Sequence, residues 1–203
     1  MKKITLLVVL AISFLGYAFV STHNEHLAIG QTSEALQFPV THLNGDETPL
    51  NSFAKENGLL IIFSSNTCPF VIAWENRYPA LASFCDENKI GFVLLNSNEA
   101  RRTGEASLSE MNRHAKEMHY DFSYAIDPNS KIANAFGAKA TPQVYLFNEK
   151  SSLVYRGAID DNHKDQNAVT HTYAMDALNN LAMGKKISPA TTKALGCSIK
   201  RVK

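Results

Sequence analysis

Residues 59–71 constrain the fold of this 203-residue chain more than any other stretch. Residues 59–63 read LLIIF, a short continuous apolar run that is typical of a buried strand. A polar turn follows at residues 64–67, and Cys68 and Pro69 come directly after it. Because proline is favoured in the first turn of a helix, we expect Cys68 to begin a helix that leaves the end of this strand.

This placement predicts a reactive thiol at Cys68. The unpaired N–H groups and the dipole at a helix start stabilise the thiolate, which is the nucleophilic form of cysteine. The alternative is a small buried cysteine that packs as a hydrophobic residue. We expect Asn66 or Thr67 to cap the helix, and Trp74 within it to pack in the core or at its rim.

The first 22 residues predict export. Lys2 and Lys3 precede an uncharged apolar stretch at residues 4–20, which is the pattern of a secretory signal peptide. An uncleaved anchor is the alternative, although a membrane span needs about 20 apolar residues. We therefore expect an exported protein of the periplasm or cell envelope, either soluble or tethered to the membrane by residues 1–22. The net charge of +1 gives no basic footprint for nucleic acid.

Export allows disulfides to persist between the three cysteines, Cys68, Cys85 and Cys197. An odd number leaves at least one thiol outside any intramolecular bond. No pair has C-x-x-C spacing and the histidines are scattered, so we expect neither a metal site nor a cofactor. Cys85 falls near the end of the helix expected after Cys68, beside its apolar face, where we expect it to pack as a hydrophobic residue.

Strand and helix signals alternate along the chain. Apolar runs predict strands at residues 38–43, 59–64, 91–96, 122–126, 143–147 and 153–155, and three- to four-residue spacing predicts helices at 69–87, 107–118, 127–136 and 173–183. Pro79 is expected to bend or interrupt the first of these helices. The order predicts an α/β fold with a mixed central β-sheet flanked by helices and a terminal β-hairpin and helix. This domain is expected at residues 23–187, followed by a tail at 188–203 that carries Cys197.

The order of motifs resembles that of the thioredoxin-like redoxins, in their peroxiredoxin-like branch of thiol-specific antioxidants. The segments that carry the resemblance are IGQ at 29–31, LNG at 43–45, NTCP at 66–69, LNSN at 95–98, TP at 141–142, YRG at 155–157, IDDN at 159–162 and GCSIK at 196–200. The resemblance implies a thioredoxin-like fold and thiol chemistry on a peroxide or on a protein or small-molecule disulfide. It also implies an unidentified thiol as the reductant.

The resemblance implies a substrate-binding side formed by Thr67, Pro69, Thr141 and Pro142. It places a cis peptide bond between Thr141 and Pro142 opposite the cysteine, and proline is the residue that makes cis accessible. Such a segment offers backbone groups to which an extended substrate can add as a strand. From the sequence alone, the alternative is an ordinary trans bond that enters an edge strand. From the sequence alone, Arg156 and the turn at residues 160–162 are expected to be solvated, whereas the resemblance suggests that this turn shapes the active-site side and assigns it no chemical role.

Two positions differ from better-known relatives. Thioredoxins carry a second cysteine three residues after the first, and this chain has Val71 there, which excludes dithiol exchange within one helical turn. Typical peroxiredoxins carry P-x-x-x-T-x-x-C, and this chain has Ile61 and Ser65 at the first two fixed positions. Ser65 can supply the hydroxyl, whereas Ile61 cannot supply the geometry of proline.

Cys197 is therefore the candidate for a second, resolving thiol. It lies in a polar tail that we expect to be extended and able to move, so that Cys197 folds back onto an oxidised or mixed-disulfide Cys68. A permanent structural disulfide, or pairing with another protein, are the alternatives. The predicted function is an exported thiol-dependent oxidoreductase that uses Cys68. The alternative function is a non-catalytic thioredoxin-fold module that binds peptides or partners.

Overall fold

The computed structural model describes residues 26–202. The predicted signal peptide or anchor at residues 1–22 lies outside the described residues. Within residues 26–202, no helix combines the length and the apolar character needed to cross a membrane.

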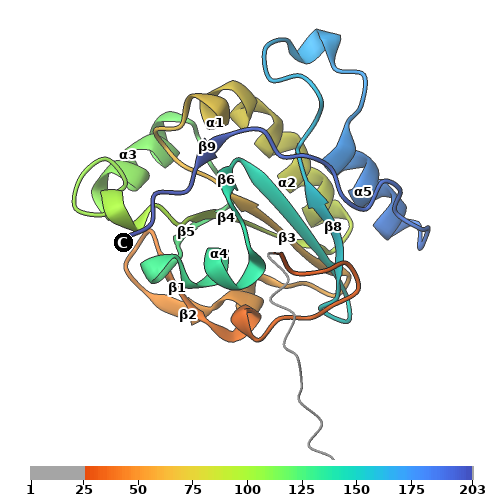
Figure 1. Ribbon diagram of the computed structural model, residues 1–203, viewed down its shortest axis with the longest axis horizontal. Coiled ribbons are helices and arrows are strands. Elements are labelled where there is room, and N and C mark those ends of the chain that lie inside the picture. The colour runs from red at the N-terminus through yellow and green to blue at the C-terminus, as the bar shows by residue number, and fades with distance from the viewer. Residues whose placement is uncertain (1–25, 203) are drawn as a thin grey trace, which may run out of the picture.

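A seven-stranded mixed sheet forms the centre of the molecule (Figure 1), in the order β2-β1-β5-β4-β3-β7-β8. The strands are β1 Pro39–His42, β2 Glu47–Pro49, β3 Gly58–Phe63, β4 Gly91–Asn96, β5 Ser123–Ile126, β7 Gln143–Asn148 and β8 Leu153–Gly157. Strands β3, β4 and β5 run parallel, and the remaining neighbours pair antiparallel. The predicted mixed sheet and the terminal β7–β8 hairpin are confirmed.

Helices cover both faces of the sheet. They are α1 Pro69–Trp74, α2 Tyr78–Glu87, α3 Leu108–Glu117, α4 Lys131–Phe136 and α5 Tyr173–Ala182, with 3-10 turns η1 Glu34–Gln37, η2 Leu50–Phe53, η3 Glu75–Arg77, η4 Glu99–Arg101, η5 Pro128–Ser130 and η6 Gln166–Ala168. Alternate residues of β3 enter two separate cores, because successive side chains of a strand point to opposite faces. One core holds side chains of α1, α2, α3 and α5, and the other holds side chains of α4, η1 and η2.

The helix expected at residues 69–87 is divided into α1, η3 and α2. Pro79 is the second residue of α2, where its missing N–H leaves no helical hydrogen bond unmade. The predicted interruption of this helix is thus confirmed, and its physical cause is the position of Pro79. The break lets α1 remain a short helix that carries Cys68 at its start.

Two short strands form a second sheet beside Cys68, which follows the end of β3. Strand β6 (Ala140–Thr141) pairs antiparallel with β9 (Cys197–Ser198), which belongs to the C-terminal tail. Figure 1 shows the tail running back across the molecule from α5 to β9 beside β6. Residues far apart in the sequence therefore meet next to the start of α1.

Candidate active site

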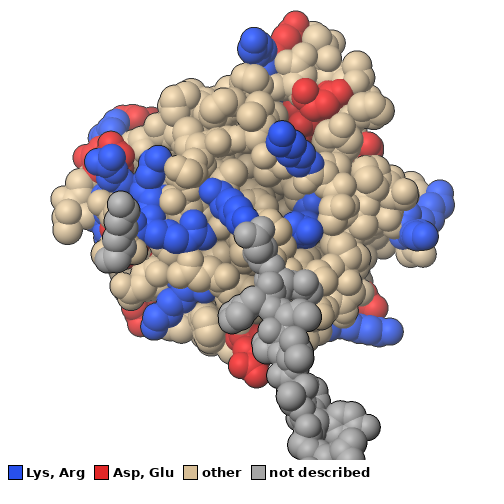
Figure 2. All heavy atoms as spheres, in the orientation of Figure 1, with Lys and Arg blue, Asp and Glu red and all other residues tan. Residues whose placement is uncertain are grey.

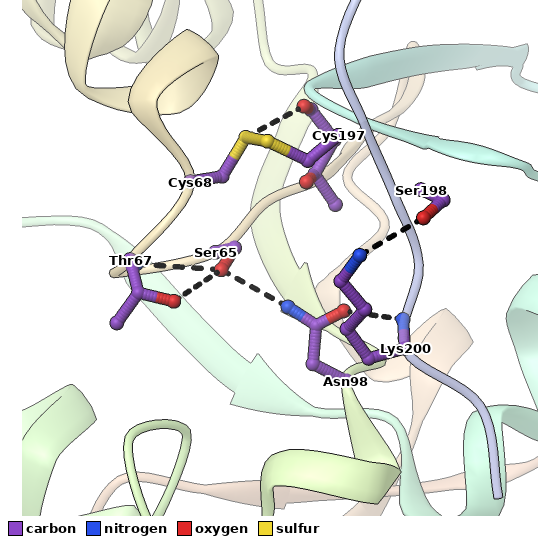
Figure 3. Close-up of a disulfide and its surroundings, with 8 residues drawn as sticks. Ser65, Thr67, Cys68, Asn98, Cys197, Ser198 and Lys200 are labelled. Carbon is purple, nitrogen blue, oxygen red and sulfur yellow. Dashed lines mark hydrogen bonds between the residues drawn. A yellow bond between two sulfur atoms is a disulfide. The ribbon is translucent and has the colours of Figure 1, made fainter.

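A disulfide joins Cys68 to Cys197 (Figure 3), with 6.2 Å between their Cα atoms. Cys85 is the free cysteine of the described residues and is fully buried. Burial raises the pKa of the Cys85 thiol to about 12, so this residue packs as a hydrophobic side chain as predicted. The tail cysteine thus supplies the second thiol that the chain lacks at position 71.

Cys68 is the N-cap residue of α1, directly after the turn that ends β3. Its carbonyl oxygen accepts the first helical hydrogen bond from the Ile72 amide at 3.0 Å. The first-turn N–H groups of a helix have no helical acceptors and favour negative charge nearby. Cys68 is only 4% exposed, and its Sγ atom lies 3.2 Å from the carbonyl oxygen of Thr141. After reduction, the helix start therefore stabilises the thiolate while burial and this carbonyl oppose it.

The expected capping role of Asn66 or Thr67 is wrong, because the cap position belongs to Cys68. The Asn66 amide instead donates to the carbonyl oxygen of Glu105 at 2.7 Å. The buried Ser65 hydroxyl holds the turn in shape: it accepts from the Thr67 backbone N–H at 3.4 Å and from the Asn98 amide at 3.0 Å (Figure 3). Thr67 itself is exposed on the outside of this turn.

The segment opposite Cys68 has the backbone that the resemblance implies. The Thr141–Pro142 peptide bond is cis, and both residues are buried beside the disulfide. Thr141 pairs with Cys197 and Ala140 pairs with Ser198. The predicted substrate-docking edge therefore carries a strand, and that strand is the chain's own tail.

The tail is extended as predicted, but it is fastened on both sides of Cys197 rather than free. Upstream, the Arg156 amide donates to Ala190 O and the Thr192 amide donates to Arg156 O, each at 3.1 Å. Downstream, the Ile199 amide donates to the Lys139 carbonyl oxygen at 3.1 Å, and the Ile199 side chain is buried. In the disulfide form the tail is thus docked against Cys68, and its movement stays a prediction.

A second feature of the site is the turn at residues 160–162, which the resemblance assigns to the active-site side. The turn expected to be solvated carries Asp160, which is only 5% exposed. Its carboxylate accepts from Trp74 Nε1 at 2.5 Å and from Arg77 Nε at 3.0 Å. This loop packs on α1, where the His163 ring lies 5.2 Å from the ring of Phe70 and 5.3 Å from that of Trp74. Trp74 is buried, as predicted, and it also fixes the loop.

A buried acid lies two helical turns after Cys68. The Glu75 carboxylate accepts from the Tyr120 hydroxyl at 2.9 Å and lies 3.0 Å from His114 Nε2. Burial raises the pKa of Glu75 and lowers the pKa of His114, so each shift favours the neutral form. No group of three His, Cys, Asp or Glu residues in the described part of the chain could hold a metal ion.

Several solved structures are similar to this chain in fold. Two solved structures are similar over most of their length: a hypothetical protein from Sinorhizobium meliloti (29% identity, TM-score 0.77, covering 86% of this chain and 95% of that one) and an uncharacterized conserved protein from Geobacillus kaustophilus (30%, 0.79, 87% and 93%). The peroxidoxin BcpB from Mycobacterium tuberculosis shares the fold at 14% identity (TM-score 0.60, 78% and 98%). The sequence matches no curated protein.

The family model of the redoxins matches residues 28–173, which include Cys68, Thr141 and Asp160 but not the tail with Cys197. The match spans most of the described domain, and the structural neighbours share its thioredoxin-like architecture. The predicted thioredoxin-like fold is therefore confirmed, and the chain belongs to the Redoxin family.

Proposed function

We propose that this redoxin is an exported thiol-dependent oxidoreductase in which Cys68 attacks the oxidant and Cys197 resolves the product. The disulfide between these two residues carries the proposal, because it joins a helix-start cysteine to the second thiol that Val71 does not provide. Membership of the Redoxin family supports thiol-based redox chemistry in general. Residues 1–22 support export to a compartment in which disulfides persist.

The proposed cycle transfers two electrons. The Cys68 thiolate attacks a peroxide oxygen, giving a sulfenic acid on Cys68 and releasing an alcohol or water after protonation. The Cys197 thiol then displaces water from the sulfenic acid and forms the disulfide. With a disulfide as the oxidant, Cys68 forms a mixed disulfide and releases one thiolate, and Cys197 releases the other. Two equivalents of an external thiol reduce the Cys68–Cys197 bond and leave as their own disulfide.

The docked tail supports Cys197 in the resolving role. Hydrogen bonds on both sides of Cys197 keep it beside Cys68. Formation of the disulfide therefore costs less chain entropy than it would with a free tail. The helix start stabilises Cys68 as the leaving thiolate when the disulfide is reduced. Ser65 and Asn98 hold the turn before Cys68 and so position the sulfur.

The decisive experiment measures turnover of hydrogen peroxide and of a small disulfide, with a thiol reductant present. Cys68→Ser should abolish turnover with both oxidants. Cys197→Ser, assayed without added reductant, should consume one equivalent of oxidant and keep the sulfenic acid or mixed disulfide on Cys68, because no resolving thiol remains. Cys85→Ser is the matched control and should keep its activity, since Cys85 is buried away from the disulfide. Equal activity of wild type and Cys68→Ser would rule out the proposal.

A non-catalytic binding module is the alternative, and the β6–β9 pairing supports it because the edge accepts an extended strand. The rate of alkylation of reduced Cys68 against pH separates the two functions. A thiol pKa below that of a free cysteine, about 8.5, fits the oxidoreductase, and a value at or above it fits the module. Cys85 serves as the internal unreactive control.

A further inference from the structure

We propose that Cys68 acts on small oxidants, namely hydroperoxides and low-molecular-weight disulfides, and not on disulfides held in peptides or proteins. This inference rests on the proposed function and narrows its substrate class. The chain's own tail fills the edge along which an extended peptide would have to lie to bring its sulfur to Cys68.

The occupied edge is visible in the pairing of β6 with β9. Thr141 lies opposite Cys197 and Ala140 lies opposite Ser198, so the tail already uses the backbone groups of β6. The Ile199 amide extends the pairing by one further hydrogen bond, to the Lys139 carbonyl oxygen at 3.1 Å. A peptide that binds by strand addition needs these same groups. It must therefore displace the tail or bind without backbone pairing.

Contacts that do not involve sulfur hold the tail in place. Thr192 Oγ1 accepts from the Ala158 amide at 2.9 Å and lies 2.7 Å from the Tyr155 hydroxyl. On the other side of Cys197, the Lys200 amide donates to Asn98 Oδ1 at 2.9 Å (Figure 3). Reduction of the disulfide breaks none of these hydrogen bonds. These contacts favour a filled edge in the reduced protein as well, which is the state that meets the oxidant.

Gly196 shows how closely the tail fits the segment before Pro142. A Cβ atom at Gly196 would overlap the carbonyl oxygen of Thr141 and lie 2.7 Å from its carbonyl carbon. The residue before Cys197 must therefore be glycine for the strand to sit at this depth. An incoming peptide with an ordinary residue before its cysteine cannot take the same position.

The helix that follows Cys68 is covered as well. The loop that carries Asp160 and His163 packs on α1, with the His163 ring against Phe70 and Trp74. Cys68 itself is only 4% exposed, beside Thr141 and the tail. A hydroperoxide or a small disulfide needs far less room than a polypeptide with its flanking residues. The shape of the site thus selects by size.

Two chromogenic disulfides with one leaving group test the inference. Free cysteine and the central cysteine of an extended peptide are each linked to thionitrobenzoate, and the release of this thiolate by the reduced full-length protein is measured in single turnover. The rate of Cys68→Ser is subtracted to remove the contribution of Cys197. We expect wild type to react with the small disulfide about tenfold or more faster than with the peptide, a difference of about 1.4 kcal/mol in activation free energy.

Gly196→Val should displace the tail strand from β6. The reaction with the peptide should then become faster, so that the rates with the two disulfides become similar. Gly104→Val is the matched control, because a Cβ atom there meets nothing closer than 3.9 Å, and it should react like wild type. Hydrogen exchange of the Cys197, Ser198 and Ile199 amides reports whether the tail has left β6. Equal rates for both disulfides in wild type would overturn the inference, as would a displaced tail without a faster peptide reaction.

A failure of the proposed function gives a different experimental result from a failure of this inference. If Cys68→Ser released thionitrobenzoate from the small disulfide as fast as wild type, the proposed function would fall, and this inference with it. If Cys68 reacts but does not discriminate, only the inference on substrate size falls. If circular dichroism shows that Gly196→Val does not fold, the comparison of the two disulfides with the wild-type protein still tests the inference.

Discussion

At the scale of single residues, Asp160 connects the loop after β8 to the helix that carries Cys68. The ion pair with Arg77 is almost fully buried, with side-chain exposures of 5% and 11%. The same carboxylate accepts the indole N–H of Trp74 and the backbone N–H of Asn162. Removing one partner of a buried pair leaves the other charge without compensation, which costs far more than losing a surface ion pair.

Asp160→Ala should therefore lower the free energy of unfolding by about 3–5 kcal/mol. Asp160→Asn keeps an acceptor for Trp74 and should lose less. Urea denaturation followed by Trp74 fluorescence measures both variants, and Asp165→Ala in the exposed part of the same loop is the control. A loss for Asp160→Ala no larger than that of the control would contradict the role assigned to Asp160.

Glu75 predicts a pH dependence of stability. Burial raises the pKa of its carboxyl group in the folded state, so the folded protein binds this proton more tightly than the unfolded chain does. The resulting stabilisation is present below the unfolded pKa and is lost as pH rises through the folded pKa. Glu75→Gln removes the charge and keeps an acceptor for Tyr120. It should be more stable than wild type at pH 8, by a margin that shrinks toward pH 4.

The lowered pKa of His114 acts in the opposite pH window, because stability from the neutral imidazole is lost as pH falls below its ordinary value of 6.5. His114→Gln separates the two effects. Urea midpoints at several pH values for wild type and both variants give the required differences. The stability difference between Glu75→Gln and wild type should shrink toward acid pH. If it stays constant or grows instead, the Glu75 carboxyl is not the group that titrates.

The local pattern identified residues whose environment is set by their own segment. Cys68 follows a strand and precedes a proline, and Cys85 falls beside an apolar helical face; both were predicted from spacing alone. Asp160 was misjudged as solvated because its partners come from a helix more than 80 positions earlier. Nothing in the turn sequence marks a carboxylate that tertiary packing will bury.

At the scale of elements, the long strands and helices were predictable and the strands of the second sheet were not. Strand β3 is a continuous apolar run and α5 has apolar residues at helical spacing, so both can be recognised without a partner. Strands β6 and β9 have two residues each and exist only because the tail returns to the start of α1. The family resemblance implied that something pairs beside Pro142. The structure shows that residues 197–198 of the same chain form this pairing strand.

The upstream fastening of the tail predicts a redox effect of Thr192. Its hydroxyl satisfies the Ala158 amide and meets the Tyr155 hydroxyl, so Thr192→Val leaves a backbone donor unpaired at a cost of about 1–3 kcal/mol. The disulfide holds the weakened tail of the variant in place, whereas its dithiol form can release the tail. This loss should therefore shift the equilibrium with glutathione toward the dithiol, by at most about tenfold for each 1.4 kcal/mol.

Mass spectrometry of the protein after alkylation, in a series of glutathione redox buffers, measures this equilibrium. Thr170→Val is the matched control, since Thr170 is exposed and bonds only within its own loop, to Asp161. An unchanged equilibrium in Thr192→Val would mean that the β6–β9 pairing and the downstream contacts hold Cys197 without the upstream anchor.

At the scale of the whole molecule, the domain is nearly neutral but its charges are unevenly placed. Figure 2 shows Lys and Arg side chains spread across the centre of the face that carries the tail, while Asp and Glu lie mostly toward its edge. Lys200 belongs to this face, and its Nζ atom lies 3.0 Å from Ser198 Oγ, next to Cys197 (Figure 3). We therefore expect a positive potential near the disulfide that concentrates anionic thiols there.

Lys200→Glu should therefore slow reduction of the disulfide by mercaptoacetate several-fold at low ionic strength, and leave reduction by neutral mercaptoethanol unchanged. Salt should remove the difference, because exposed charges are screened over about 10 Å at 0.1 M. Lys150→Glu makes the same charge change in the β7–β8 turn and should affect neither reaction. Acid quenching and mass spectrometry give the second-order rate constants. Equal slowing with both thiols would point to altered tail packing, because a neutral reductant does not respond to the potential.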